Sequence, residues 1–233
     1  MSEQSKEWFI SMKLKKKILI VCGIAVTLIL LFWGQIFNKR ESFLYAEKVA
    51  DVEKLMEEEK IEEALELMDE VDKEFGRTDR ISKDRALIYM YMRKYEEAIN
   101  QAEQLSDKSS IEYYSLKEQI YEYMGEEGIE ELFDTYIAAA NDWPEWTYMQ
   151  KYAGIAQMER YNYGSAEAYL HQAYKQDKTD PTLLFAIGAL KYYQGDYEAS
   201  VRFFQEAVDH ELPIEMYDYV TYFLEQIKGE EME

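Results

Sequence analysis

Residues 193–207 read YQGDYEASVRFFQEA, and a related stretch, ERYNYGSAEAYLHQA, occupies residues 159–173. Aromatic, small and large apolar residues fall in matching places in the two stretches. The same interval continues back to Tyr45 without an insertion or deletion and gives five copies. Self-similarity at a fixed period of this size is typical of repeat architectures. We therefore predict that most of the chain is an array of similar units.

Five positions in the unit carry the pattern, counting Tyr45 as position 1. Of the 25 residues at positions 8, 17, 20, 24 and 27, 22 are hydrophobic, whereas the overall hydrophobic content of 48% predicts about 12. Positions 8, 20 and 27 are mostly small, and positions 17 and 24 are mostly bulky. Small residues let two helices approach closely, and bulky side chains fill the space between neighbouring helices. Each unit is therefore predicted to be a pair of packed helices.

This 34-residue helical period resembles the tetratricopeptide repeat (TPR). The stretch GDYEASVRFFQEA is the clearest match, with Gly195 and Asp196 at the turn between helices A and B and Tyr197 at the start of helix B. The resemblance covers Tyr45 to Leu212 and implies an all-α fold, a right-handed TPR solenoid of about five helix–turn–helix repeats. The repeats are expected at residues 45–78, 79–112, 113–146, 147–180 and 181–212.

Residues at the ends of the predicted helices agree with this division. Asp180 and Pro181 form the N-cap and first-residue pair favoured at a helix start, and residues 142–144 are expected to act in the same way before the fourth repeat. Gly76 follows a helix-B pattern, as a C-terminal glycine does. The sequence GEEG at 125–128 is expected to be the A–B turn of the third repeat.

The two ends of the array are less regular. In the first repeat, Lys48 and Asp51 stand where apolar residues are usual, so its first helix is expected to be an atypical cap. At the other end, Pro213 opens an amphipathic segment. We expect a capping helix at residues 213–229, followed by a short tail at 230–233, because a solenoid must cover its last apolar face.

The first 44 residues differ from the rest of the chain. Residues 1–17 are expected to be a short basic N-terminus, and residues 18–37 form an apolar run with Gln35 as its one strongly polar member. Twenty helical residues match the hydrocarbon core of a bilayer, about 30 Å thick. We therefore predict one transmembrane helix at 18–37, joined to the repeats by a helical linker at 38–44.

Three other interpretations of the apolar run are less well supported. A cleaved signal peptide has an apolar region of about 7–15 residues and then a small-residue cleavage site, and this run is longer and lacks such a site. A lipoprotein modified at Cys22 needs a small residue before the cysteine, and Val21 is not small. A buried core helix this apolar would be hard to cover in so polar a protein.

Basic residues near the span predict its orientation. Five lysines precede the span, whereas Lys39, Arg40 and Lys48 follow it. This bias favours a cytoplasmic N-terminus, with the TPR domain outside the cytoplasm at the cell membrane. Because Lys39 and Arg40 lie on the opposite side, repeats that face the cytoplasm are the alternative.

Composition and motifs argue against several classes of function. The formal net charge of −21 argues against nucleic-acid binding, which needs a basic surface. His171 and His210 are far apart in the sequence, Cys22 is the only cysteine, and no phosphate-binding loop or nucleophile motif occurs. Acidic pairs such as Glu96 and Glu97 begin the predicted B helices, where negative charge suits the helix dipole. We predict no enzyme activity, catalytic residue, metal, cofactor or small-molecule substrate.

The candidate site follows from the TPR resemblance, which implies a concave groove lined mainly by helix-A positions 2, 5, 9, 12 and 13. Here these positions hold basic residues, tyrosines and methionines, which suit carboxylates, stiff contacts and varied apolar side chains respectively. The alternative is that the methionines pack between neighbouring A helices and the lysines are only solvated. The predicted groove residues are Arg80, Lys83, Lys117, Lys151, Tyr114, Tyr148, Tyr121, Met90, Met124, Met158 and Tyr192.

Together these features predict a non-enzymatic, membrane-anchored TPR scaffold. Its partner is expected to be a protein or peptide at the cell envelope, for example in secretion or assembly. The alternative is a membrane adaptor of the same fold that faces the cytoplasm and recruits soluble partners.

Overall fold

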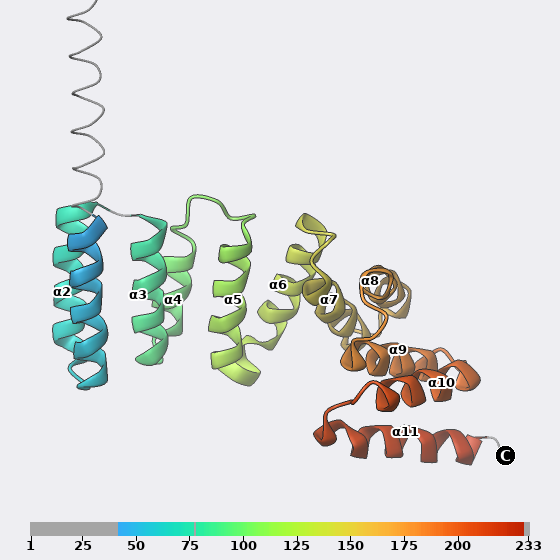
Figure 1. The fold of residues 1–233 in the computed structure, drawn as a ribbon. Coiled ribbons are helices and arrows are strands. Elements are labelled where there is room, and N and C mark those ends of the chain that lie inside the picture. Colours follow the sequence, from blue (N-terminus) through green and yellow to red (C-terminus); the bar gives the residue numbers. More distant parts are fainter. Residues whose placement is uncertain (1–41, 77, 231–233) are drawn as a thin grey trace, which may run out of the picture. The chain divides into compact units, whose positions relative to one another are not determined.

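The computed structural model describes residues 42–76 and 78–230, and all regular secondary structure in these ranges is helical (Figure 1). The chain divides into two compact units, one ending at Ile81 and the other beginning at Ser82. The predicted basic N-terminus, the predicted transmembrane helix at 18–37 and residues 38–41 of the predicted linker lie outside the described residues. Within the described ranges, none of the helices has the length and apolar character needed to cross a membrane.

The first unit contains a hairpin of two helices, residues 42–57 and α2 (Ile61–Phe75). The ring of Tyr45 meets the edge of Phe75 at 5.7 Å, and the guanidinium of Arg80 lies 4.6 Å from the Tyr45 ring. Lys48 forms an ion pair with Glu74 of α2 at 2.8 Å. Lys48, which stands at a usually apolar position of the repeat, therefore has a carboxylate partner on the second helix.

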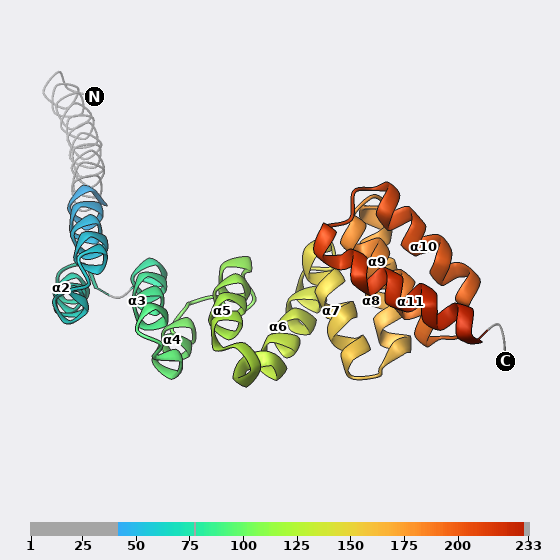
Figure 2. The same ribbon diagram turned by 90° about the horizontal axis from the view of Figure 1, so that it is seen from below.

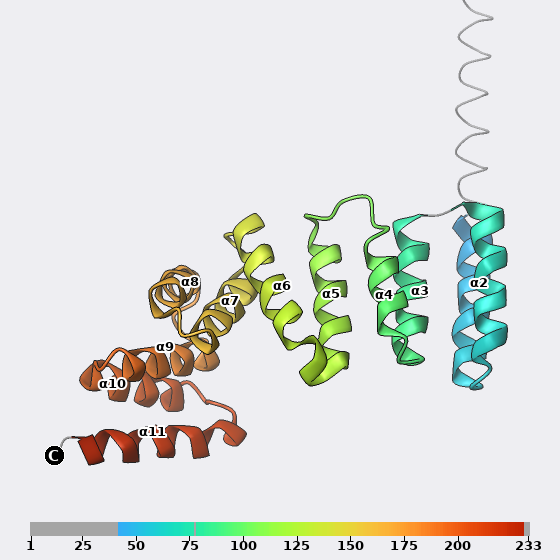
Figure 3. The same ribbon diagram turned by 180° about the vertical axis from the view of Figure 1, so that it is seen from behind.

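The second unit continues the series of hairpins, and the figures show successive helices running in opposite directions (Figures 1 and 3). The second helix of every hairpin, from α2 to α10, begins at residue 61, 95, 129, 163 or 197, so these starts keep the interval of the sequence repeat. The helices from α3 onward are α3 (Asp79–Tyr91), α4 (Tyr95–Ala102), α5 (Ile111–Met124), α6 (Ile129–Asp142), α7 (Thr147–Glu159), α8 (Tyr163–Gln176), α9 (Pro181–Tyr193), α10 (Tyr197–Asp209) and α11 (Tyr217–Glu230).

Small residues allow close contact between the two helices of a hairpin, as the sequence predicted. A Cβ atom placed on Gly154 would come within 2.5 Å of the Leu170 side chain, and one on Gly188 would come within 2.7 Å of the Phe204 ring. Ser200 is fully buried and donates a hydrogen bond from Oγ to the Gly188 carbonyl at 2.8 Å. Interiors packed at this density leave no room for an added methyl group.

The turn between the paired helices has the same backbone form in four hairpins. Glu59, Arg93, Tyr161 and Gly195 have φ values of 58°, 57°, 60° and 77°. In the last of these turns, the Gly195 N–H donates to the Tyr192 carbonyl and the next N–H donates to the Lys191 carbonyl, each at 2.9 Å. This pair of bonds satisfies the last carbonyls of the first helix. The third hairpin instead uses a short 3-10 helix, Gly125–Gly128, at the predicted turn.

Most predicted helix ends are confirmed. Asp180 caps α9 by accepting hydrogen bonds from the Thr182 and Leu183 N–H groups, and Gly76 follows the last residue of α2 with φ 74°. The prediction for residues 142–144 is wrong, because Asp142 is the last residue of α6 and the residue before α7 is Trp146. The chain between these helices is taken up by a turn, in which the Trp146 N–H donates to the Trp143 carbonyl.

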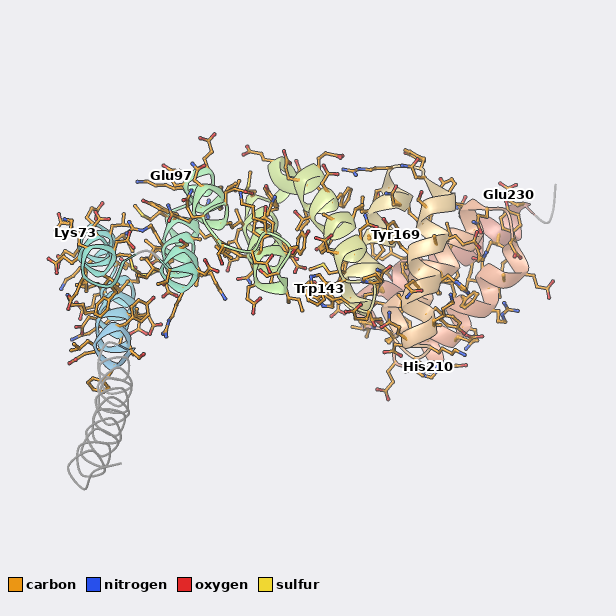
Figure 4. The ribbon with its side chains drawn as sticks, turned by 90° about the horizontal axis from the view of Figure 1, so that it is seen from above. Lys73, Glu97, Trp143, Tyr169, His210 and Glu230 are labelled. Carbon is orange, nitrogen blue, oxygen red and sulfur yellow. The ribbon has the colours of Figure 1, made fainter. Side chains whose placement is uncertain are left out.

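The fourth helix ends earlier than the repeat pattern suggests, and residues 103–110 form a loop. Asp107 accepts hydrogen bonds from the backbone and side chain of Ser109, and Ser110 caps α5 by accepting from the Tyr113 N–H. Short polar side chains of this kind compete with the helix for backbone hydrogen bonds. Trp143, labelled in Figure 4, closes over the loop by donating from Nε1 to the Ser109 carbonyl at 2.6 Å.

The last helix, α11, follows Pro213 and a short 3-10 helix, Ile214–Met216. It packs against α9 and α10 and lies across α9 when the molecule is seen from below (Figure 2). Its buried residues are Val220, Phe223 and Ile227, whereas Asp218 and Glu225 are exposed. A polar outer face is what the terminal element of a repeat array needs, since no further unit covers it.

Candidate functional site

A groove of about 480 Å3 lies among α7, α9 and the segment formed by the second 3-10 helix and α11. Most of its lining is apolar or aromatic, and its two charged residues, Lys151 and Glu159, both belong to α7. We call it the α7–α9–α11 groove. Its lining residues are Lys151, Tyr152, Ile155, Met158 and Glu159 of α7, Thr182, Phe185, Ala186, Ala189 and Tyr193 of α9, and Met216, Tyr219 and Phe223 of the last segment.

All of these residues stand at helix-A positions 2, 5, 6, 9, 12 or 13 when the repeat count is continued past residue 214. In that count Met216, Tyr219 and Phe223 take positions 2, 5 and 9 of a sixth copy. The helix predicted as a cap thus supplies one wall of the groove. This wall was not predicted from five repeats ending at Leu212, although Met216, Tyr219 and Phe223 keep the repeat spacing beyond it.

The floor of the groove is held rigidly. The Phe223 ring stacks on the fully buried Phe204 ring at 5.3 Å, and it meets Phe185 at 6.2 Å and Tyr192 at 5.0 Å. Ala189 of α9 is buried and also lines the groove. Interlocked aromatic rings have few alternative rotamers, so the floor keeps its shape when a ligand enters.

Two tyrosines form the rim of the groove. Tyr219 is 61% exposed and projects from α11. Tyr193 is 48% exposed, and one face of its ring stacks on Tyr163 at 5.6 Å with an interplanar angle of 8°. Partial burial raises the pKa of Tyr193, and the nearby Glu159 carboxylate raises it further. The Tyr193 phenol is therefore a neutral hydrogen-bonding group at neutral pH.

The lysine of the groove already forms an ion pair and a hydrogen bond within the protein. Lys151 is buried, and its Nζ lies 2.8 Å from Asp180 Oδ2 and 2.6 Å from Thr182 Oγ1. Burial by itself raises the pKa of Asp180, but hydrogen bonds from Lys151, Thr182 and the Leu183 N–H outweigh it and the net pKa is lowered. The carboxylate that caps α9 therefore also neutralises the predicted groove lysine.

A second predicted lysine is also paired. Lys117 of α5 lies 3.6 Å from Glu103, and its Nζ lies 5.3 Å from the Tyr113 ring and 5.6 Å from the Tyr121 ring. The third lysine of the row, Lys83, lines a separate shallow hollow of about 220 Å3 between α3 and α5. The structure thus places Lys83 and Lys151 in different hollows.

The predicted tyrosines are mostly structural. Tyr114 is buried and donates a hydrogen bond to Asp142, and Tyr148 donates to Glu118 at 2.6 Å. Glu118 is buried, and burial raises its pKa although the Tyr148 hydroxyl lowers it in part. Tyr121 is buried on α5.

The remaining predicted residues divide between packing and the groove. Met90 is buried in the core of the α3–α7 region, and Met124 packs against the same core. Met158 is half-buried and lines the groove, whereas Tyr192 packs against Phe223 and Tyr197. Arg80 belongs to the first unit. Of the predicted residues, Lys151 and Met158 are those that line the α7–α9–α11 groove.

Other arrangements that carry chemistry are few. No group of three or more histidine, cysteine, aspartate or glutamate residues that could hold a metal occurs in the described part of the chain. His171 lies in α8, whereas His210 directly follows the last residue of α10 (Figure 4). A second hollow, about 560 Å3, lies among α8, α9 and α10, and an ion pair between Lys191 and Glu167 at 2.7 Å lies among its lining residues.

Comparison with known proteins gives matches at the level of structure. No protein-family model and no curated protein matches the sequence. YrrB, described as a TPR protein with an unusual peptide-binding site, has a TM-score of 0.55 and 13% identity, with 75% of this chain and 90% of that chain covered. A MamA structure has a TM-score of 0.56 and 14% identity, with 72% of this chain and 91% of that chain covered. A double mutant of MamA RS-1 has a TM-score of 0.57 and 10% identity, with 72% and 94% covered. These likenesses show that the described helices have a TPR-like repeat fold.

Proposed function

We propose that this protein is a non-enzymatic binding scaffold whose α7–α9–α11 groove holds a peptide or a segment of a partner protein. The observation that carries the proposal is the groove itself, an apolar hollow of about 480 Å3 with a fixed aromatic floor and an exposed tyrosine on its rim. Concave, mostly apolar sites of about 300–1,000 Å3 are typical of ligand binding. Aromatic anchors carry a large share of interface energy.

Rigidity supports the same proposal. Phe223 is fixed by contacts with Phe185, Tyr192 and Phe204, so few side chains have to be ordered when a partner binds. A site that is already shaped loses less conformational entropy on binding and keeps more of the contact energy. YrrB has a peptide-binding site on a similar fold, which supports a peptide ligand by analogy alone.

The scaffold is further proposed to be a single-pass membrane protein. The support is the apolar run at 18–37, which is long enough to cross a bilayer, together with the five lysines that precede it. In this arrangement the helical hairpins and the groove are outside the cytoplasm. The cytoplasm-facing adaptor is the alternative, and a reporter enzyme fused after Glu233 separates the two. Activity of a reporter that works only outside the cytoplasm supports the exported form.

The groove proposal is tested by photocrosslinking in intact cells. A photoreactive phenylalanine replaces Tyr219, which lines the groove, or Tyr123, which is 68% exposed on α5 and does not line it. We expect crosslinked adducts with Tyr219→photoreactive phenylalanine and much weaker adducts with the Tyr123 variant. Equal adducts at both positions, or none at Tyr219, would contradict binding in the groove.

A further inference from the structure

We propose, on the basis of the binding function above, that the segment held in the α7–α9–α11 groove is basic. In chemical terms it is a peptide segment in which Lys or Arg stands next to a large apolar side chain. This is opposite to the acidic ligand that the predicted row of lysines would select. Three features of the groove lead to this conclusion.

The first feature is that the positive charge of the groove is already paired with a carboxylate of the protein. Lys151 is 8% exposed and already contacts Asp180 at 2.8 Å and Thr182 at 2.6 Å. An acidic ligand would have to share Lys151 with Asp180, whose other oxygen, Oδ1, accepts hydrogen bonds from the Thr182 and Leu183 N–H groups as the cap of α9. A second carboxylate at Lys151 would therefore lie beside the negative charge of Asp180, which opposes its binding.

The second feature is the charge that remains in the groove. Glu159 is exposed, lines the groove, and has no ion pair with any of the residues that the structure describes. Its negative charge contributes to the raised pKa of Tyr193 at the rim. The Tyr219 ring on the opposite wall is 61% exposed and offers an aromatic face. A carboxylate and an electron-rich ring together favour a cation.

The third feature is the apolar part of the lining. Ile155, Met158, Phe185 and Phe223 surround a volume of about 480 Å3, which suits a large apolar side chain. Methionine adapts to side chains of different shape, whereas the phenylalanine rings are fixed. A ligand with an apolar residue beside a basic one can fill this volume and place its charge near Glu159.

The charge of the whole chain acts in the same direction. With 26 basic and 47 acidic residues, the protein attracts cationic segments at a distance and repels acidic ones. A second copy of the chain carries the same net charge of −21, so long-range repulsion opposes its docking in the groove. Charge complementarity therefore favours a basic partner over self-association.

The test uses three fluorescent peptides of equal length with a central Phe-Leu pair flanked by Arg, by Gln or by Glu. Binding to the full-length protein in detergent micelles is followed by fluorescence anisotropy at low and physiological salt. We expect the Arg peptide to bind at least about fivefold more tightly than the Gln peptide, and the Glu peptide to bind most weakly. The preference should shrink as salt rises, because solvent-exposed charges are screened.

Matched variants separate the groove from general attraction to an acidic protein. Glu159→Gln should weaken binding of the Arg peptide about two- to fivefold, as expected for one partly exposed ion pair. Glu225→Gln removes an exposed carboxylate from the opposite side of α11 and should leave binding unchanged. In the same way, Tyr219→Ser should weaken binding of the Arg and Gln peptides, and Tyr123→Ser, at a 68% exposed tyrosine on α5 that does not line the groove, should not.

Each outcome decides between the two proposals. If the three peptides bind equally and Tyr219→Ser weakens all of them, the groove binds apolar segments and the basic preference is wrong. Tighter binding of the Glu peptide also overturns the preference. If no peptide binding responds to Tyr219→Ser, the proposed function itself fails. Dimerisation of the full-length protein that Tyr219→Ser abolishes would instead identify a second copy as the occupant and overturn the inference.

Discussion

Replacing Gly188 by alanine is expected to destabilise the last hairpin, although alanine is normally the better residue inside a helix. Gly188 lies in α9, and an added Cβ would come within 2.7 and 2.8 Å of two ring atoms of Phe204. The ring is fully buried and cannot move away easily, since it meets Phe185 at 5.5 Å and Phe223 at 5.3 Å. The added methyl group therefore overpacks a rigid part of the core.

The expected size of the effect follows from two opposing terms. Overpacking a well-packed core typically costs about 1–3 kcal/mol. The higher helix propensity of alanine than of glycine stabilises the folded protein by about 1 kcal/mol. Because the neighbouring rings restrict relaxation around Gly188, we expect a net loss of about 1–2 kcal/mol in the free energy of unfolding. Gly164→Ala is the matched control, because a Cβ at this position of α8 meets nothing within 4 Å. It should gain up to about 1 kcal/mol.

Urea unfolding followed by far-UV circular dichroism measures both variants. A second substitution, Phe204→Leu, tests the mechanism, since a smaller side chain makes room for the new methyl group. We expect Phe204→Leu to cost less in the Gly188→Ala background than in the original protein, as coupled neighbours do. If Gly188→Ala is as stabilising as Gly164→Ala, the reasoning that α9 and α10 are in close contact at Gly188 and Phe204 is refuted.

Three further substitutions test other parts of the structure by urea unfolding. Asp196→Ala removes the cap of α10, which accepts from the Ala199 N–H, and should cost about 1 kcal/mol, whereas no change would refute the cap. The pKa of Asp180 is lowered in the folded protein, so its contribution is present at neutral pH and lost as the pH falls below about 4. Asp180→Asn should lower the free energy of unfolding at pH 7 and reduce its fall at acidic pH. An unchanged dependence of stability on pH would contradict the ion pair between Asp180 and Lys151. Burial raises the pKa of Glu118, so the ionised carboxylate destabilises the folded protein at neutral pH. This destabilisation disappears as the pH falls through the raised pKa and the carboxyl group becomes protonated. Glu118→Gln should therefore leave stability at pH 7 unchanged or higher, and a large loss would show that the ionised group is stabilising.

Much of the fold could be predicted because the repeat pattern consists of residues that determine turns and helix packing within one hairpin. The B helices begin at one fixed interval, where a turn and then an aromatic or aliphatic residue occur in the sequence. The early end of α4 at Ala102 was not predicted, because the repeat count carries no information about competition from Asp107 and the neighbouring serines. The role of Trp143 in closing that loop depends on contact between different hairpins, which the local pattern does not specify.

The candidate site was harder to predict than the fold. The repeat count identified Lys151 and Met158 as groove residues, and its continuation would have added Tyr219 and Phe223. It could not predict that Lys151 is neutralised by Asp180, because the two residues are 29 positions apart and pair only when consecutive hairpins are packed. A residue type at a groove position indicates which side chains line the surface, but its charge is available to a partner only if no neighbour already binds it.

Methyl NMR of protein labelled at its methionines gives the most direct test of binding in the α7–α9–α11 groove. Met158 and Met216 line the groove, whereas Met90 and Met149 are buried elsewhere in the second unit. On titration with the Arg-flanked peptide, we predict shifts of the Met158 and Met216 methyl signals that saturate together, with the Met90 and Met149 signals unchanged. If the Met158 and Met216 signals do not shift while signals of other methionines do, the peptide binds elsewhere. That result would contradict binding in the α7–α9–α11 groove.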